Sequence, residues 1–582
     1  MDSFKTLKPF IRKHKWKYIL GVIWLIIIDT VQLLVPRILG NATDDLAANT
    51  LGREGLIHYA LLIILTGLII FLGRYFWRIY IIGTSRTLEY YLRKKLFNKL
   101  LTLSTNYYNT HKTGDLMAHA TNDINAVRMA LGPGTIMLVD AVFLIVLSLY
   151  MMISLTGFRF TMTLIITFPL IMIIVNIFGK IIYKRFKKVQ QAFSNLSDVT
   201  QESLSGIRVI KSFVQEDLVS QNFHRVNKNN FDKNLDLVKI HGLFNPLLQF
   251  LASISFLILI FYGGRQVIGE NISLGDFVAF NSYLGLLIWP TRALGMVINV
   301  LQRGMASMDR LNSIFEEEPE ILESENPIIL DKVNGTIEFR DVSFKYPNTN
   351  NYAVEDINFK LASGKSLALI GLTGSGKTTI INLLLRLYDV DKGEILFDGI
   401  NIKDLDLSSL REAIGYVPQD NFLFSETITD NISFAYDQKV PMDQVIKASK
   451  AAEVYDNIIE FPNKYDTILG ERGVTLSGGQ KQRTSIARAL IKEPEVVILD
   501  DSLSAVDTET EENILKNLSS MLKKTTSIII SHRVSTIKNA DEILYLKNGR
   551  IHERGSHHEL IELNGHYKSL YDKQLLEKKI NQ

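Results

Sequence analysis

Six long apolar stretches in the first half of the chain constrain its fold more than any other feature. A helix that crosses the hydrocarbon core of a bilayer needs about 20 consecutive, mainly apolar residues. The stretches of this length are Tyr18–Leu39, Ile57–Trp77, Ile136–Leu155, Phe160–Phe178, Leu243–Tyr262 and Phe277–Val300. The first lacks the small-residue cleavage site of a secretory signal peptide. The sequence therefore predicts an all-α membrane unit of six spans.

The distribution of charged residues predicts the orientation of this unit. Basic residues precede the first span, at positions 5, 8, 12, 13, 15 and 17. Segments rich in lysine and arginine remain in the cytoplasm. Because six spans return the chain to its starting side, we expect both the N-terminus and the second half to be cytoplasmic. The absence of cysteine and the lack of targeting signals suit a bacterial plasma membrane.

Two polar connections between spans are long enough to form helical arms. They comprise residues 78–135 and 179–242, and both are rich in helix-favouring residues. At 1.5 Å per residue, about 25 residues out and 25 back would project far from the bilayer. We place the turn of the first arm at Lys112–Leu116 and that of the second at Ser205–Lys211.

Two carboxylates fall within the predicted spans. Asp29 lies near the middle of the first span and Asp140 lies in the cytoplasmic part of the third. Ionisable groups in a bilayer are costly and usually face a cavity or a partner. These carboxylates either face a wet cargo path, which would favour cationic amphipathic cargo, or serve a structural role; the sequence leaves both open.

The second half has the composition of a soluble α/β protein. Residues 316–335 are acidic, contain prolines and lack a clear period, so we interpret them as a linker. Strands and helices then alternate, which is typical of an α/β domain. The predicted division is 1–315 for the membrane domain, 316–335 for the linker and 336–582 for the second domain. A net charge of +3 is too small to indicate nucleic-acid binding.

A phosphate-binding loop begins the functional part of this domain. Gly371–Thr378 fits the pattern G-x-x-x-x-G-K-[ST], between an apolar strand (Ser366–Ile370) and a predicted helix (Thr379–Leu387). Glycines let backbone N–H groups surround an anion at a helix N-terminus. Lys377 can reach the β- and γ-phosphates, and the Thr378 hydroxyl can ligate Mg²⁺.

Two further motifs complete a nucleotide-hydrolysing set. Val496–Asp500 is an apolar strand that ends in a carboxylate, the form of a Walker B strand whose aspartate holds Mg²⁺. Leu476–Gln480, with the sequence Leu-Ser-Gly-Gly-Gln, precedes a predicted helix at Lys481–Leu490. Two glycines and a serine at a helix N-terminus form a second anion-binding site.

This order of motifs resembles the ATP-binding-cassette proteins, and six spans ahead of it resemble an ABC exporter half-transporter. The resemblance covers essentially the whole chain. It implies a six-helix membrane domain with long cytoplasmic extensions, followed by an α/β P-loop NTPase domain, with ATP and Mg²⁺ as cofactors. It also implies that two cassettes enclose two ATP molecules head to tail, each site combining the phosphate loop of one cassette with the signature of the other.

The resemblance assigns roles to individual residues. Tyr346 corresponds to the aromatic residue that stacks on adenine, Gln419 to the Q-loop residue that contacts Mg²⁺, and His532 to the switch histidine on the γ-phosphate. Ser504–Asp507 corresponds to the D-loop, and Glu471 to the loop that meets the arms. The nucleotide-binding set is Tyr346, Gly371, Leu372, Thr373, Gly374, Ser375, Gly376, Lys377, Thr378, Thr379, Gln419, Ser477, Gly478, Gly479 and Gln480. The metal set is Thr378, Gln419 and Asp500, and the catalytic set is Asp501, His532 and Gln419.

Asp501 departs from the family pattern. A glutamate normally follows the Walker B aspartate and activates the attacking water. Aspartate is one methylene shorter, and a misplacement of about 1 Å can cost on the order of 100-fold in rate. We therefore expect this chain's site to bind ATP but hydrolyse it slowly. Heterodimeric bacterial exporters often pair a chain with aspartate here with a partner that carries glutamate.

Several functions remain open from the sequence. The leading expectation is a subunit of an exporter for amphipathic drugs or lipids, with a different half-transporter as partner. A homodimeric lipid or peptide exporter and a mainly regulatory subunit are the alternatives. A soluble cassette protein is excluded by the six spans. The apolar spans do not identify the cargo.

Overall fold

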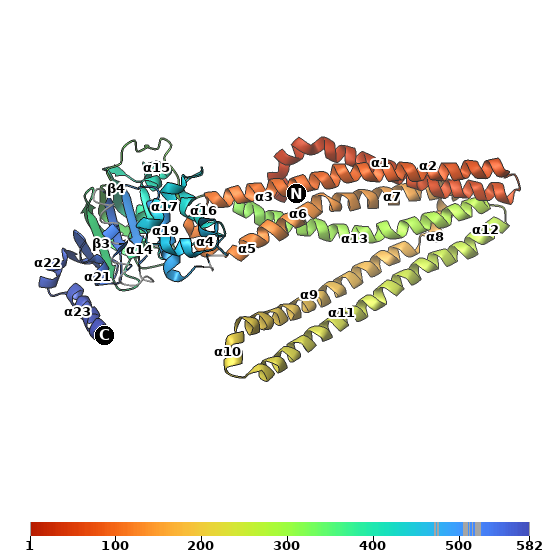
Figure 1. Cartoon of the computed structure of the whole chain (residues 1–582). Coiled ribbons are helices and arrows are strands. Elements are labelled where there is room, and N and C mark those ends of the chain that lie inside the picture. The colour runs from red at the N-terminus through yellow and green to blue at the C-terminus, as the bar shows by residue number, and fades with distance from the viewer. Residues whose placement is uncertain are drawn as a thin grey trace. The chain divides into compact units, whose positions relative to one another are not determined.

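The computed structural model divides the chain into two compact units (Figure 1). One comprises Met1–Leu101 and Thr113–Glu317, and the other comprises Thr102–Lys112 and Glu318–Gln582. The structure describes residues 2–347, 349–470, 473, 476–503, 510, 513, 514, 516, 517 and 525–580.

The first unit is entirely helical. Its helices are η1 (Asp2–Leu7), α1 (Lys8–Ala47), α2 (Arg53–Trp77), η2 (Arg78–Ile82), α3 (Gly83–Thr102), α5 (Thr113–Ala118), η3 (His119–Asp123), α6 (Ile124–Leu131), α7 (Pro133–Thr156), α8 (Phe158–Leu164), α9 (Thr167–Ser205), α10 (Ile207–Ser212), α11 (Glu216–Ile258), η4 (Leu259–Gly263), α12 (Gly264–Ile268) and α13 (Leu274–Glu316). Among the residues that the structure describes, six continuous helical segments are long and apolar enough to cross a membrane, and each contains one predicted span. The predicted fold class is confirmed, and the chain is a multi-pass membrane protein.

An apolar cluster joins α1, α7, α8, η4 and α13. Leu33 of α1, Leu144 of α7, Phe160 of α8 and Phe280 of α13 are all buried in it. The rings of Phe160 and Phe280 meet edge to face, with centroids 5.2 Å apart. Tyr283 places its hydroxyl in the same cluster, where it donates to the carbonyl of Leu33 at 2.8 Å. This buried polar contact satisfies a phenol that would otherwise be costly among apolar side chains.

The long helices continue beyond the apolar stretches into arms. In the second arm, α9 and α11 lie side by side and are joined at α10 (Figure 1), which overlaps the predicted turn at Ser205–Lys211. The first arm differs from prediction. Its short connecting helix α4 (Thr105–Thr110) precedes the expected turn at Lys112–Leu116, and Gly114 lies within α5. The helical structure is interrupted at the extended residues Ser104 and His111 instead, and Gly114 adopts helical geometry.

The second unit contains α4 and a two-sheet cassette. Its strands are β1 (Ile337–Phe344), β2 (Val354–Leu361), β3 (Ser366–Gly371), β4 (Lys392–Phe397), β5 (Ile400–Asn401), β6 (Ile414–Val417), β7 (Val496–Asp500), β8 (Thr526–Ile530), β9 (Glu542–Lys547) and β10 (Arg550–Gly555). An antiparallel sheet has the order β2-β1-β4-β5. The other sheet has the order β10-β9-β3-β8-β7-β6, and only β10 is antiparallel to its neighbour.

Helices cover these sheets, and the described ones are short. They are α14 (Lys377–Leu384), α15 (Leu407–Glu412), α16 (Ile428–Ile432), η5 (Ser433–Ala435), α17 (Met442–Ala451), α18 (Tyr455–Glu460), η6 (Lys464–Asp466), α19 (Gly478–Leu490), α21 (Val534–Ile537), α22 (His557–Glu562) and α23 (His566–Ile580). Strand β7 is buried at every residue, which explains its uninterrupted apolar sequence.

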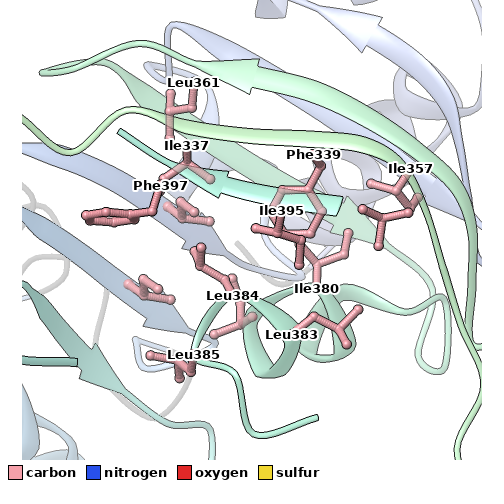
Figure 2. Packing of buried hydrophobic residues seen from close by; sticks show 14 of the residues in the cluster. Ile337, Phe339, Ile357, Leu361, Ile380, Leu383, Leu384, Leu385, Ile395 and Phe397 are labelled. Atoms are coloured by element: carbon pink, nitrogen blue, oxygen red, sulfur yellow. The ribbon is translucent and has the colours of Figure 1, made fainter. Parts of the chain in front are cut away.

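The helix after the phosphate loop is fixed by the main apolar core. Figure 2 shows Ile380 and Leu384 of α14 beside Phe339 and Ile395 of the antiparallel sheet. The same core includes Leu369 of β3, so α14 contacts residues from both sheets. Burying an aliphatic or aromatic side chain of this size contributes about 1.5–3 kcal/mol. The core therefore holds the N-terminus of α14 in place beneath the loop.

The segment predicted as a linker is held against the cassette. Ile328 forms a β-bridge with Leu405. The guanidinium of Arg386 donates to the carbonyl of Leu322 at 2.8 Å. The Asp398 carboxylate accepts backbone N–H groups at 2.7, 3.2 and 2.7 Å from Asn334, Gly335 and Thr336. These contacts account for the order of a segment that has no sequence period.

Asp398→Asn should loosen this segment. The amide replaces one acceptor oxygen with a donor that faces other donors, and losing a hydrogen bond to a charged group costs about 1.5–3 kcal/mol. Asparagine tolerates the left-handed backbone at this position, where φ is 50°. We expect faster tryptic cleavage at the neighbouring exposed Lys332. Asp404→Asn is the matched control, and equal cleavage rates in the two variants would contradict the assignment.

Candidate nucleotide-binding site

The candidate site lies where four parallel strands end. The phosphate loop follows β3, Gln419 follows β6, Asp500 ends β7 and His532 follows β8. Leu369 and Asp500 both align with Ile530 in the sheet register. Parallel strands present their carboxyl ends at one edge of a sheet, which is where α/β proteins bind ligands. The fold therefore gathers these predicted site residues at one edge.

The backbone of the phosphate loop requires its glycines. Gly374 and Gly376 have φ values of 79° and 99°, which side chains disfavour. A Cβ atom on Gly376 would also lie 2.6 Å from the carbonyl oxygen of Ala353. The loop therefore passes close to its neighbours and turns into α14 with its N–H groups at the helix start. This is the arrangement that accommodates a phosphate.

Lys377 is the buried cation of the loop. Its Nζ donates to the carbonyls of Gly371 and Leu372, both at 3.0 Å. Burial lowers the pKa of Lys377, and the nearby carboxylates of Asp500 and Asp501 oppose that shift. The ammonium is thus oriented by the loop itself beside the end of β7.

Asp500 offers an oxygen that fits a metal ion. Its side chain is 1% exposed, and Oδ2 has no hydrogen-bond partner among the residues that the structure describes. Burial raises the pKa of Asp500, and a hydrogen bond from the Thr378 hydroxyl opposes this. The Ser375 hydroxyl is also buried and has no hydrogen-bond partner among the described residues. Carboxylate and hydroxyl oxygens are ligands that suit Mg²⁺, so this donor set fits the expected cofactor.

Asp501 occupies an unusual backbone position at the same edge. Its φ is 46°, and its N–H donates to the carbonyl of Ile530 at 2.9 Å. Aspartate is among the residues that adopt left-handed backbone most readily. The half-buried carboxylate follows directly after Asp500, as the sequence placed it.

Gln574 holds the loop of His532 and was not anticipated from the sequence. This residue of α23 donates its amide Nε2 to the His532 carbonyl at 2.7 Å. Its Oε1 accepts the N–H of Val534 at 2.9 Å. A glutamine in a polar helix carries no signal of such a role, because the contact spans residues far apart in the chain.

Tyr346 lies beside the start of α14 and is linked to the first arm. Its hydroxyl is 3.2 Å from the Thr379 hydroxyl. Its ring meets that of Tyr388 edge to face, with centroids 5.3 Å apart. The Tyr388 hydroxyl accepts from the Asn109 side chain of α4 at 2.7 Å. Tyr346, the candidate adenine-binding residue, is therefore linked to α4 through Tyr388. The sequence does not reveal this link.

The signature residues form an exposed helix start. Helix α19 begins at Gly478, earlier than the predicted Lys481. Ser477 caps it, because its hydroxyl accepts the Gln480 N–H at 3.3 Å while Gln480 Oε1 accepts the Ser477 N–H at 2.9 Å. This capping box explains the early start. Ser477 and Gly478 are exposed, and Gly479 is half-buried.

Arg488 connects the signature helix to the segment after Gln419. Its guanidinium donates to the carbonyls of Asn431 and Phe422 at 2.7 and 2.8 Å, and to Asn431 Oδ1 at 2.9 Å. Burial lowers the pKa of Arg488 to about 10. No local pattern singles out this arginine, since its partners lie far away in the chain. Ser504–Asp507 and Glu471 lie outside the described residues.

Removing the Gln574 amide should expose the backbone of the His532 loop. In Gln574→Ala, Val534 loses its acceptor, and a hydrogen bond of about 1 kcal/mol corresponds to roughly fivefold faster exchange of that amide. Gln574→Glu retains the acceptor and should keep Val534 protected. Hydrogen–deuterium exchange on a peptide spanning this loop measures both. Unchanged exchange in Gln574→Ala would show that Gln574 does not hold the His532 loop.

Comparison with known proteins places this geometry in a family. Residues 18–291 match the model described as ABC transporter transmembrane region, and residues 354–504 match the model described as ABC transporter. The chain is 40% identical over 572 residues to a probable multidrug resistance ABC transporter ATP-binding/permease protein, YheI, of Bacillus subtilis, covering 98% of this chain and 97% of that protein. It is 33% identical over 582 residues to an ATP-dependent lipid A-core flippase of Syntrophus aciditrophicus, covering 100% and 96%.

A solved structure agrees with these matches. A bacterial Atm1-family ABC exporter with ATP bound aligns with a TM-score of 0.79 and 26% identity, over 97% of this chain and 99% of that chain. Its likeness extends over both units. The fused membrane unit and cassette therefore belong to the ABC transporter family, and the chain is an ATP-driven transport ATPase of that family.

Proposed function

We propose that this chain is one half of an exporter that moves amphipathic drugs or lipids out of the cytoplasm or inner leaflet. The observation that carries the proposal is the gathering of Lys377, Asp500 and His532 at one sheet edge in a chain with six spans. The multidrug and lipid A relatives support both cargo classes. The basic N-terminus favours a cytoplasmic cassette. The proposed division is a membrane domain at 1–315, a linker at 316–335 and the cassette at 336–582.

In this proposal the phosphate loop holds ATP. Backbone N–H groups of Gly371–Thr379 and the Lys377 ammonium would bind the phosphates, and Tyr346 would stack on adenine. Thr378 and Asp500, with Gln419, would hold Mg²⁺, which neutralises phosphate charge when bound. His532 would contact the γ-phosphate, and Gln574 would position the loop that carries it.

A second half-transporter is required because the signature faces outward. The N–H groups at the start of α19 are accessible, and Ser477 and Gln480 bond to each other. Ser477–Gln480 would therefore serve a nucleotide held by another cassette. The tip of the second arm also exposes large apolar side chains, with Val209 61%, Phe213 72% and Val214 80% exposed. Exposed apolar clusters of this kind mark interaction surfaces.

The partner is proposed to be a different chain, with glutamate after its Walker B strand. Asp501 is the reason, since a shortened carboxylate suits a site that holds ATP and turns it over slowly. Two alternatives persist. A homodimeric lipid or peptide exporter would need Asp501 to be an adequate base, and the flippase relative favours lipid cargo. A mainly regulatory subunit would show almost no turnover of its own.

Asp501→Glu should restore hydrolysis at this chain's site. The longer side chain brings the carboxylate about 1 Å closer to the water, which is worth up to about 100-fold in rate. The measurement is ATP turnover in lipid nanodiscs, for this chain alone and with a candidate partner. Asp501→Asn is the matched control and should remain slow.

Two outcomes would contradict this proposal. Turnover by the unmodified chain alone at about 10 s⁻¹, a typical enzyme rate, would favour the homodimer. Unchanged turnover in Asp501→Glu within the complex would show that carboxylate length does not limit the site.

A further inference from the structure

A polar cavity lies inside the membrane unit, away from the nucleotide site. It has a volume of about 370 Å³ and is bordered by α1, α2, α7 and α13, with Arg78 at the start of η2. Helix α1 packs against each of the other three (Figure 1). Its polar and aromatic lining includes Asp29, Gln32, Arg74, Trp77, Asp140 and Trp289.

Two carboxylates of this cavity have unused acceptor atoms. Asp29 is only 3% exposed, and its Oδ2 has no hydrogen-bond partner among the described residues. Asp140 is half-buried, and its Oδ1 also has no hydrogen-bond partner among the described residues. Buried polar atoms are nearly always paired, and an unpaired carboxylate oxygen among apolar helices is expensive. Both residues line the cavity, so a molecule bound there could supply the missing donors.

The charges around the cavity favour a cation beside Asp29. Asp29 and Asp140 lie close enough to interact electrostatically, and this interaction is repulsive. The positive charge of Arg74 attracts the Asp140 carboxylate and partly offsets its negative charge. Arg78 is placed over the ring of Trp77, with its guanidinium carbon 5.5 Å from the centroid. Asp29 is thus the carboxylate whose charge is least compensated.

The remaining walls suit an organic cation. Trp77 and Trp289 provide aromatic surface, which attracts cations as well as apolar groups. Pro290 has no N–H, so it cannot donate the usual helical hydrogen bond to the carbonyl of Leu286. Both residues border the cavity. The volume is near the lower end of the range for ligand pockets, about 300–1,000 Å³. It fits an amine with a ring-sized substituent and is too small for a whole lipid.

We propose that this cavity binds the protonated amine of an amphipathic cargo molecule, through N–H donors to Asp29 and Asp140. The proposal rests on the proposed export function and narrows its substrate class to ammonium-bearing amphiphiles. An N–H bearing cation satisfies the two orphaned oxygens, and a charge-assisted hydrogen bond is about twice as strong as a neutral one. The aromatic walls would hold the ring of the same molecule.

Three matched probes test the proposal in the full-length chain in lipid nanodiscs, without nucleotide. They are 2-naphthylmethylamine, its trimethylammonium analogue and neutral 2-naphthylmethanol. We expect the protonated amine to bind most tightly. Asp29→Asn should weaken amine binding by about 10-fold or more, as expected for losing a charged hydrogen bond. Binding of the alcohol should not change.

Controls separate the site from general damage. Glu54→Gln removes an exposed acidic side chain elsewhere in the membrane unit and should leave amine binding unchanged. Asp29→Glu retains the charge and should recover part of the affinity. An Asp29→Asn variant that binds the alcohol normally is folded, so its loss of amine binding would be specific.

Three results would overturn the proposal. They are unchanged amine affinity in Asp29→Asn, equal losses for amine and alcohol, and displacement of the amine by millimolar Na⁺ or K⁺ at constant ionic strength. The last would assign the cavity to an inorganic cation. Because binding is measured without nucleotide, failure of ATP-driven export would leave this result intact, and the two proposals fail separately.

Discussion

The parallel register of β3, β8 and β7 is the constraint on which the cassette depends. Ile530 lies opposite Leu369 on one side and Asp500 on the other, so three chain segments reach the same edge together. The phosphate loop, Asp500 with Asp501, and His532 reach one edge of the sheet because of that alignment. Apolar burial maintains it, because α14 packs into a core shared by both sheets. The site is consequently built from strand ends, and its loops add donors to a rigid edge.

Much of this arrangement could be predicted from the sequence. The six spans follow from length and composition alone, and the strand that ends at Asp500 was predicted with the observed bounds, Val496–Asp500. The glycines of the phosphate loop are recognisable in the sequence because the loop needs positive φ angles, as at Gly376. Local patterns of this kind predict the structure correctly because they do not depend on contacts with distant residues.

Features created by distant contacts could not be predicted. Gln574 and Arg488 act on loops far away in the chain, and nothing in their local sequence separates them from ordinary surface residues. The connecting helix of the first arm lies before the predicted turn at Lys112–Leu116, and Gly114 stays helical within α5, because glycine is tolerated inside a helix. Residues after Glu317 lacked a period, yet Asp398 orders part of that segment through three backbone N–H groups.

We propose that this chain retains its own ATP while the partner cassette hydrolyses a second ATP, to which Ser477–Gln480 of this chain contributes. The most direct measurement identifies the nucleotide retained on each chain of the assembled exporter after turnover, using photoreactive ATP labelled at the α- or γ-phosphate. We expect both labels on this chain, as triphosphate, and only the α-label on the partner, as diphosphate. Diphosphate on this chain in equal amount would contradict it.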